Sequence, residues 1–157
     1  MIYITGDTHS DFSRFTEENF PIQSEMTKDD YIIICGDFGG VWTFEEESRR
    51  EKEALDWLNN KNFTTLFVDG NHENYTRLYN YPIEEWKGGK VHKIRDSVLH
   101  LMRGEIFDID NKKYLLLVVL NRMIFKMEYW IWMKKKKYMS IVKEEHILEL
   151  EIFRGGI

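Results

Sequence analysis

Apolar runs in the first half of the chain alternate with segments of helical spacing. Met1–Thr5, Tyr31–Cys35 and Thr64–Val68 are short runs of mainly apolar and β-branched residues, the pattern of parallel strands buried on both faces. Between them, Asp11–Phe20 and Glu45–Asn60 place apolar residues three and four positions apart, as a helix with one buried face does. Strand, helix, strand, helix, strand in this order predicts an α/β sheet with right-handed crossovers.

The two predicted helices have different end signals. The first is expected to stop at Pro21, because proline cannot continue a helix that precedes it. The second has an apolar face that includes Leu55 and Leu58, and acidic residues gather at its start, where the helix dipole favours negative charge. We therefore expect the second helix to be the clearest helical element of the chain.

After Pro82 the pattern changes to short strands. Asp108–Lys113 has Asp-Asn turn chemistry between two apolar runs, which predicts a hairpin. No internal repeat and no linker composition interrupts the chain, so one domain is expected. The strand candidates in this half are Val91–Ile94, Val98–Met102, Ile106–Ile109 and Tyr114–Leu120.

Composition places the chain among ordinary globular proteins. It has 157 residues, of which 43% are hydrophobic and 31% charged, enough to bury a core. The longest apolar run, 115–120, is too short to span a bilayer, and no signal peptide is indicated. A single cysteine, Cys35, excludes an intrachain disulfide and is expected to be buried and inert. These features predict a cytoplasmic protein without a membrane partner.

Charge is distributed unevenly along the chain. Residues 1–114 contain 14 Lys and Arg against 22 Asp and Glu, a net charge of −8, whereas residues 115–157 contain 8 against 5, a net charge of +3. An acidic body argues against a clamp for the nucleic-acid backbone, which relies on clustered basic residues. The basic run Lys134–Lys137 is interpreted as a solvated stretch, so no specific nucleic-acid partner is predicted.

Each of the three predicted parallel strands runs into a glycine and then into polar residues. Asp7 and His9 follow the first strand, Asp37 the second, and Asn71 and His72 the third. Singly, such residues are also typical of turns and helix caps. Ligands of open α/β sheets bind at the carboxyl ends of the strands, however, so these side chains are expected to converge. Carboxylate, amide and imidazole ligands suit Mn²⁺, Fe or Zn²⁺ better than Mg²⁺.

The segments GDTHSD, GDFGG and GNHE resemble, in type and order, the three N-terminal blocks of the calcineurin-like metallophosphoesterases. The resemblance implies a sheet sandwich flanked by helices and hydrolysis of phosphomonoesters or phosphodiesters with two divalent ions and an activated water. It implies that Asp7 and His9 hold the first ion, that Asp37 bridges, and that Asn71 holds the second ion. His72 would protonate the leaving group or contact the transition state.

The family pattern stops in the last quarter of the chain. The later histidine and the G-H-x-H block of the family have no counterpart, and His146 is the sole histidine after His100. We therefore expect 1–114 to be the N-terminal part of a metallophosphoesterase domain and 115–157 a divergent, out-of-frame tail. The hypothesis is a truncating frameshift near Tyr114; the alternative is a genuine but divergent C-terminal segment. His92 and His100 match no block and are expected on the surface or on a strand face.

Three functions compete at this point. The first is a metal-dependent phosphoester hydrolase with a phosphoester substrate, and the second is an inactive truncated fragment that binds at most one ion weakly. The third is a doubly wound nucleotide-binding module, which the missing GxGxxG motif argues against.

Overall fold

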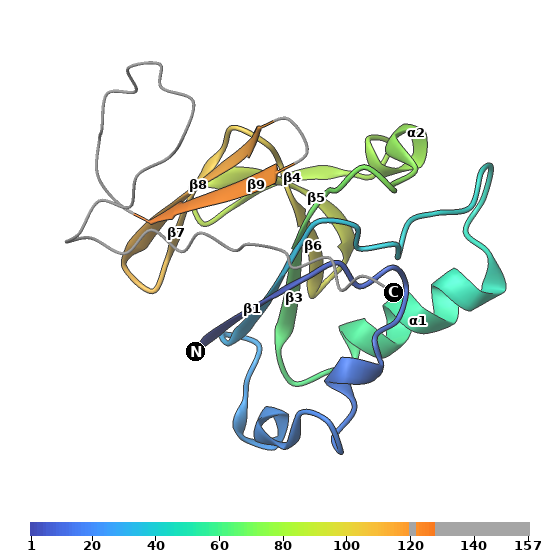
Figure 1. Ribbon diagram of the computed structural model, residues 1–157, viewed down its shortest axis with the longest axis horizontal. Coiled ribbons are helices and arrows are strands. Elements are labelled where there is room, and N and C mark those ends of the chain that lie inside the picture. The colour runs from blue at the N-terminus through green and yellow to red at the C-terminus, as the bar shows by residue number, and fades with distance from the viewer. Residues whose placement is uncertain (120–121, 128–157) are drawn as a thin grey trace.

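Two β-sheets form the part of the chain that the computed structural model describes, residues 1–119 and 122–127 (Figure 1). A six-stranded sheet has the order β1-β2-β3-β6-β5-β4, and a three-stranded sheet has the order β7-β8-β9. The strands are β1 (Ile2–Gly6), β2 (Tyr31–Cys35), β3 (Thr64–Val68), β4 (Ile83–Trp86), β5 (Gly89–Arg95), β6 (Val98–Leu101), β7 (Ile106–Ile109), β8 (Lys112–Val119) and β9 (Arg122–Met127). The helical elements are the 3₁₀ turns η1 (Ser13–Phe15) and η2 (Pro21–Glu25) and the α-helices α1 (Arg49–Asn59) and α2 (Tyr75–Leu78).

Strands β1, β2, β3 and β6 are parallel, and their register aligns their carboxyl ends. Gly6 pairs with Cys35, and Cys35 pairs with Val68, so the loops that follow these three residues leave the sheet at the same edge. Every residue of β2 and β3 is buried, which explains why their sequences are so continuously apolar and β-branched. The predicted α/β sheet is confirmed.

The larger sheet is covered on both faces. Ile32 and Ile34 of β2 lie in the core beside α1, whereas Ile33 points to the opposite face, toward the three-stranded sheet. The first core also contains Phe12, Phe15, Leu55, Leu58 and Phe67, and the second Leu66, Phe107, Ile109 and Tyr114. Figure 1 shows α1 on one side of the larger sheet and β7, β8 and β9 on the other. The expected sheet sandwich with helical elements outside it is present.

Helix α1 begins later than the acidic pattern predicts. Ser48 caps it: the Ser48 side chain accepts from the Glu51 amide at 3.2 Å, and the Glu51 carboxylate accepts from the Ser48 amide at 2.9 Å. This reciprocal capping box fixes the start at Arg49. The acidic residues before it stay outside the helix, and Glu47 pairs with Arg95 of β5 at 2.7 Å instead.

The predicted helix over Asp11–Phe20 is wrong. The segment contains the single 3₁₀ turn η1, and Pro21 begins η2 rather than ending a helix. Polar side chains compete here for the main chain, because the Asp11 carboxylate accepts from the Ser13 amide at 3.0 Å and the Asn19 side chain donates to the Ser13 carbonyl at 3.0 Å. The spacing of the phenylalanines predicted correctly that these side chains are buried, but it predicted the wrong secondary structure for the segment.

Three two-residue hairpins organise the second half of the described residues, joining β4 to β5, β5 to β6, and β7 to β8. The predicted turn between β7 and β8 is confirmed, with Asp110 and Asn111 at φ 54° and 60°, as a two-residue hairpin of primed type requires. The hairpin between β4 and β5, which turns at Lys87 and Gly88, was not predicted, because β4 is mostly exposed and lacks an apolar pattern.

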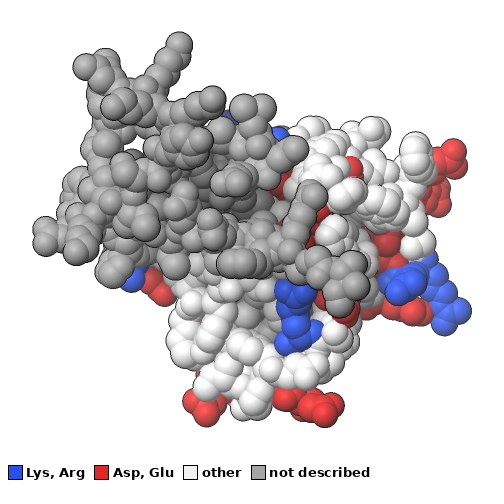
Figure 2. Space-filling view, viewed as in Figure 1, with Lys and Arg blue, Asp and Glu red and all other residues white. Residues whose placement is uncertain are grey.

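The proposed boundary at residue 114 falls inside β8, which pairs with β7 and β9. Residues 120–121 and 128–157, including Lys134–Lys137 and His146, lie outside the described residues, and the frameshift hypothesis stays a prediction. Figure 2 shows acidic and basic side chains of the described residues interspersed on one face. No helix in the described ranges is both long and apolar enough to cross a bilayer.

Candidate metal centre

The three loops at the carboxyl edge are tied to one another by main-chain hydrogen bonds. The amide of His9 donates to the carbonyl of Asp37 at 2.8 Å, and the amide of Ser10 donates to the carbonyl of Phe38 at 3.2 Å. Asp7, His9 and Asp37 have φ values of 25°, 46° and 34°, a region that non-glycine residues rarely adopt. Such local backbone strain concentrates at functional sites, where surrounding contacts hold it in place.

Asp37 lies at the centre of the site and contacts two histidines. Its Oδ1 accepts from the His72 amide at 2.9 Å, and its Oδ2 lies 2.9 Å from His72 Nδ1 and 3.7 Å from His9 Nε2. The ligand atoms of these three residues all lie within 4.8 Å of one another. Asp37 is largely buried while both imidazoles are about half exposed, so the cluster opens to solvent on the histidine side.

The Asp37 carboxylate is held in its charged form. Burial on its own would raise the pKa of Asp37, but the side-chain and backbone hydrogen bonds from His72, together with the His72 charge, outweigh burial and lower that pKa. An ionised carboxylate between two imidazoles is the charge state in which a divalent cation binds.

Gly70 permits the third loop to approach Asp37 this closely. A Cβ at this position would stand 2.0 Å from Asp37 Oδ1 and 2.2 Å from the Asp37 amide nitrogen, far inside contact distance. The glycine before Asn71 is therefore required by the packing of one loop against another, and any side chain there would displace Asp37.

The three side chains fit a divalent ion. Nitrogen and oxygen ligands at about 2.0–2.2 Å from one ion stand about 3–4 Å from each other, and the His9–Asp37 and His72–Asp37 contacts are 3.7 and 2.9 Å. Two imidazoles and one carboxylate suit Zn²⁺, Mn²⁺ or Fe better than Mg²⁺, which prefers oxygen ligands.

Asp7 and Asn71 lie close by in different surroundings. Asp7 is not one of the three clustered side chains; its charge acts on Cys35, whose pKa is raised to about 12 by burial and, further, by Asp7. Its main-chain carbonyl accepts from Arg14 at 3.3 Å. The Asn71 side-chain amide lies 3.2 Å from the His72 ring. The structure thus gathers His9, Asp37 and His72 and leaves Asp7 and Asn71 adjacent to them.

Glu73 is a buried part of the site to which the sequence analysis gave no role. It follows Asn71-His72 directly, and its Oε1 accepts from the amides of Phe38 at 2.6 Å and Gly39 at 3.4 Å, joining the third loop to the second. Burial raises the pKa of Glu73 to about 8 against these two hydrogen bonds, and the charge of Asp37 adds to the rise. In the sequence, the position of Glu73 at the end of the GNHE segment was the feature that could have indicated this role.

A second histidine–aspartate arrangement is buried in the larger sheet, with a partly exposed arginine at its end. Its members are His92 of β5, His100 of β6, Asp69 at the end of β3 and Arg103. The two Nδ1 atoms of the histidines lie 2.9 Å apart, His100 Nε2 lies 3.0 Å from Asp69 Oδ1, and Arg103 pairs with Asp69 Oδ2. His92 and His100 are on strand faces as expected, but the surface alternative is wrong, since the pairing of β3 with β6 encloses them.

Comparison with known proteins agrees with this geometry. A family model described as calcineurin-like phosphoesterase matches residues 1–147. The chain therefore belongs to the calcineurin-like phosphoesterase family, and its α/β sheet sandwich is consistent with the N-terminal part of that fold. Neither the curated proteins nor the solved structures give a match.

Proposed function

We propose that this protein hydrolyses phosphoesters, monoesters or diesters, with divalent ions bound at the carboxyl edge of β1, β2 and β3. The observation that carries the proposal is the His9–Asp37–His72 cluster at the carboxyl ends of β1, β2 and β3. Ligands of open α/β sheets bind at such strand ends, and membership of the family supports the proposal. The resemblance of the loops to the family blocks supports two ions, with Asp7 and Asn71 as additional ligands.

Asp37 is the central ligand in this proposal. Its two carboxylate oxygens already have different neighbours, with the His72 amide on Oδ1 and both imidazoles near Oδ2, which suits a carboxylate shared between ions. A divalent ion, when bound, supplies Lewis-acid stabilisation of phosphoryl oxygens and activation of water.

In this proposal His72 transfers a proton during hydrolysis. Its amide and its Nδ1 are both fixed on Asp37, so the ring has one nitrogen anchored while half of the side chain faces solvent. In this role His72 is not itself an ion ligand: when its Nδ1 donates to Asp37, Nε2 is available to exchange a proton with the leaving-group oxygen. His9, equally exposed, lies across the cluster with its ring centroid 5.5 Å from that of His72.

A second function is supported by one specific observation. Among the His, Cys, Asp and Glu side chains of the described residues, one group of three has its ligand atoms close enough together to share an ion, which is enough for one ion but not two. A protein that binds one ion weakly and turns over little is therefore the alternative.

Activity and metal titration of the 157-residue chain separate these two functions. Mn²⁺ binding is measured by isothermal titration calorimetry, and hydrolysis of an aryl phosphate and an aryl phosphodiester is followed in the same buffer. The matched control is Asp37→Asn, which keeps the side-chain shape and removes the charge.

Turnover that requires Mn²⁺ and disappears in Asp37→Asn supports the hydrolase and refutes the inactive alternative. One weakly bound Mn²⁺ with turnover equal in both proteins supports the alternative and refutes the hydrolase. The ratio of monoester to diester hydrolysis then assigns the substrate class.

A further inference from the structure

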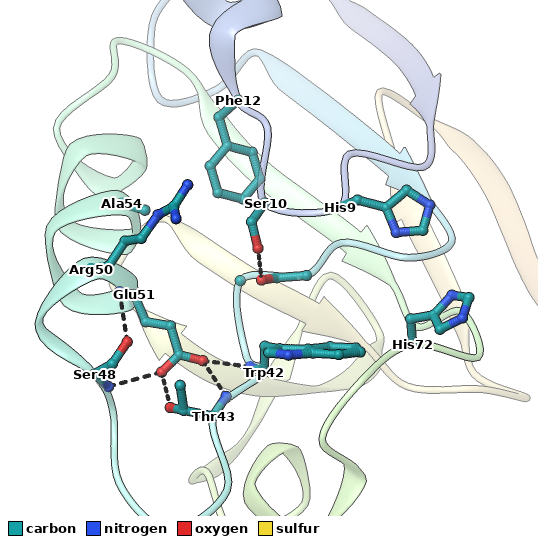
Figure 3. A pocket seen from close by; sticks show the side chains of 12 residues that line it. His9, Ser10, Phe12, Trp42, Thr43, Ser48, Arg50, Glu51, Ala54 and His72 are labelled. Atoms are coloured by element: carbon teal, nitrogen blue, oxygen red, sulfur yellow. Dashed lines mark hydrogen bonds between the residues drawn. The ribbon is translucent and has the colours of Figure 1, made fainter.

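A cavity of about 390 Å³ adjoins the metal centre and extends to the start of α1. His9 and His72 line one end of it, Arg50 and Ser48 of the α1 region line the other, and Trp42 lies between them (Figure 3). Its volume lies within the range of about 300–1,000 Å³ that is typical of sites for small organic ligands. The cavity is continuous with the residues proposed to act on the phosphoryl group.

Trp42 offers an aromatic surface beside the metal centre. Trp42 is 53% exposed, which is unusual for the largest apolar residue, and its ring centroid lies 6.3 Å from that of His72. Figure 3 shows the indole between His72 and Thr43 at the edge of the cavity. An exposed indole in a fixed position favours stacking with a flat ring of a ligand.

The wall that carries Trp42 is held rigidly by Glu51. The Glu51 carboxylate accepts from the amide of Thr43 at 2.7 Å and lies 3.0 Å from Arg77 Nη1. Burial alone would raise the pKa of Glu51, but its hydrogen bonds, those from Thr43 foremost, lower it to about 2. Because Glu51 pairs with Arg77, its negative charge is not paired with the cation at the other end of the cavity.

That cation is Arg50. Among the described residues no hydrogen-bond acceptor or acidic side chain pairs with it, and it lines the cavity in Figure 3. Its neighbour Arg49 differs on both counts, since it pairs with Glu53 at 2.7 Å and does not line the cavity. An unpaired guanidinium at the end of a ligand-sized cavity is suited to a carboxylate or a phosphate.

We propose that this cavity binds the alcohol part of the substrate, and that the substrate is a phosphoester carrying a flat aromatic ring and, beyond the ring, a second anionic group. This inference rests on the proposed phosphoesterase function. The phosphoryl group lies at His9 and His72, the ring lies against Trp42, and the second anion pairs with Arg50. Acidic aryl phosphates and nucleotides with a second phosphate share this chemistry.

Calorimetric titrations with ligands that cannot be hydrolysed test the assignment without relying on turnover. The full chain in Mn²⁺ is titrated with benzylphosphonate and with 4-carboxybenzylphosphonate. It is titrated separately with the phosphonate analogues of adenosine 5′-monophosphate and adenosine 3′,5′-bisphosphate, in which carbon replaces each ester oxygen. The expected result is that the ligand with the second anion binds about tenfold more tightly, as one charge-assisted pair gives. The second pair of ligands distinguishes nucleotides from simpler aryl acids.

Two sets of variants assign the effect to residues. Arg50→Gln should abolish the tenfold preference, Arg50→Lys should keep part of it, and Arg49→Gln is the matched control that should keep all of it. Trp42→Ala should weaken both members of each pair about tenfold, whereas Trp57→Ala, an exposed tryptophan of α1 outside the cavity, should not. Circular dichroism verifies that each variant is folded.

The inference is overturned if the wild type binds both ligands of a pair equally tightly, or if Arg49→Gln and Arg50→Gln lose the same amount of the preference for the second anion. The outcome is distinguishable from failure of the proposed function. If the chain shows no turnover but still prefers the ligand with the second anion, and this preference depends on Arg50, the subsite is supported and the hydrolase is refuted. If turnover requires Mn²⁺ but neither ligand is preferred, the hydrolase is supported and the subsite is refuted.

Discussion

The molecule contains two clusters of histidine and aspartate with opposite surroundings. In His9–Asp37–His72 the imidazoles are 56% and 53% exposed. In the cluster of His92, His100 and Asp69, the three residues are 2%, 1% and 0% exposed. Both clusters lie near the carboxyl ends of parallel strands, and both place an imidazole about 3 Å from a carboxylate.

The difference shows what makes such a cluster available to a ligand. In the buried cluster, His100 uses one ring nitrogen on His92 and the other on Asp69, and Asp69 pairs in addition with Arg103. In the open cluster two half-exposed rings approach a single carboxylate from the solvent side. The first arrangement satisfies its own polar groups and supports the sheet, and the second has the open positions that a metal ion requires.

The largest expected effect is on stability, in the buried cluster. Asp69→Ala removes the carboxylate from two partners and leaves His100 buried without its acceptor, so we expect the free energy of unfolding to fall by about 3–5 kcal/mol. Urea denaturation measures the change. Mn²⁺ affinity, measured under folding conditions, should change far less than in Asp37→Asn; the reverse pattern would contradict the division between the clusters.

The second effect is on metal binding, in the open cluster. Asp37→Asn removes the charge that both imidazoles face, and we expect Mn²⁺ to bind at least about 100-fold more weakly, a loss of about 2.7 kcal/mol. Calorimetric titration gives the affinity. The unfolding free energy without metal serves as the control and should change by less than about 1 kcal/mol, as for other partly solvated ion pairs.

The third effect tests the close approach of Gly70 to Asp37 in the open cluster. Gly70→Ala places a Cβ 2.0 Å from Asp37 Oδ1, and we expect overpacking to cost about 1–3 kcal/mol of unfolding free energy. Because the methyl group displaces Asp37, Mn²⁺ affinity should fall as well, as calorimetry can measure. Gly104→Ala is the contrasting control, because a Cβ there meets nothing within 4 Å while φ is +82°, whereas Gly70 has crowding without a positive φ.

The smallest effect is a pH dependence of the buried cluster. Burial, and then the neighbouring His100, lower the pKa of His92 below its ordinary 6.5, against the opposing charge of Asp69. Below about pH 6.5 the unfolded chain therefore takes up a proton that the folded chain refuses, and the unfolding free energy falls with decreasing pH, by at most about 1.4 kcal/mol per unit for one site.

Denaturation of the wild type and of His92→Phe between pH 7.5 and 5.5 measures this contribution. The variant retains an aromatic ring against Tyr79, on which His92 stacks at 5.5 Å, and should lose part of the slope. An unchanged slope in the variant would show that His92 is not the group that takes up the proton.

Strand ends and their polar loops could be predicted from the sequence because the signals are local. A buried parallel strand must be apolar throughout, so each run and the glycine after it indicate where the chain leaves the sheet, as at Gly6 and Cys35-Gly36. The hairpin at Asp110-Asn111 is equally local, because these residues tolerate the positive φ that the turn imposes.

Side-chain hydrogen bonds and long-range strand pairing decided what the apolar pattern could not. The segment after Asp11 failed as a helix because side-chain hydrogen bonds compete with the helical ladder, although its phenylalanines are in the core. The start of α1 depended on Ser48 and Glu51 rather than on the acidic residues before them. The burial of His92 and His100 follows from β3 pairing with β6, a contact between distant parts of the chain.

The sequence by itself determined the three strands, the polar residues at their ends and the family of the chain, since these depend on residue type and order. The tertiary structure decided which of those residues come together. It brings His9 and His72 to Asp37 because the register aligns three strand ends and Gly70 permits close approach. It also separates the open cluster from the buried one, because burial depends on which strands pair, and strand pairing is not encoded in any single segment.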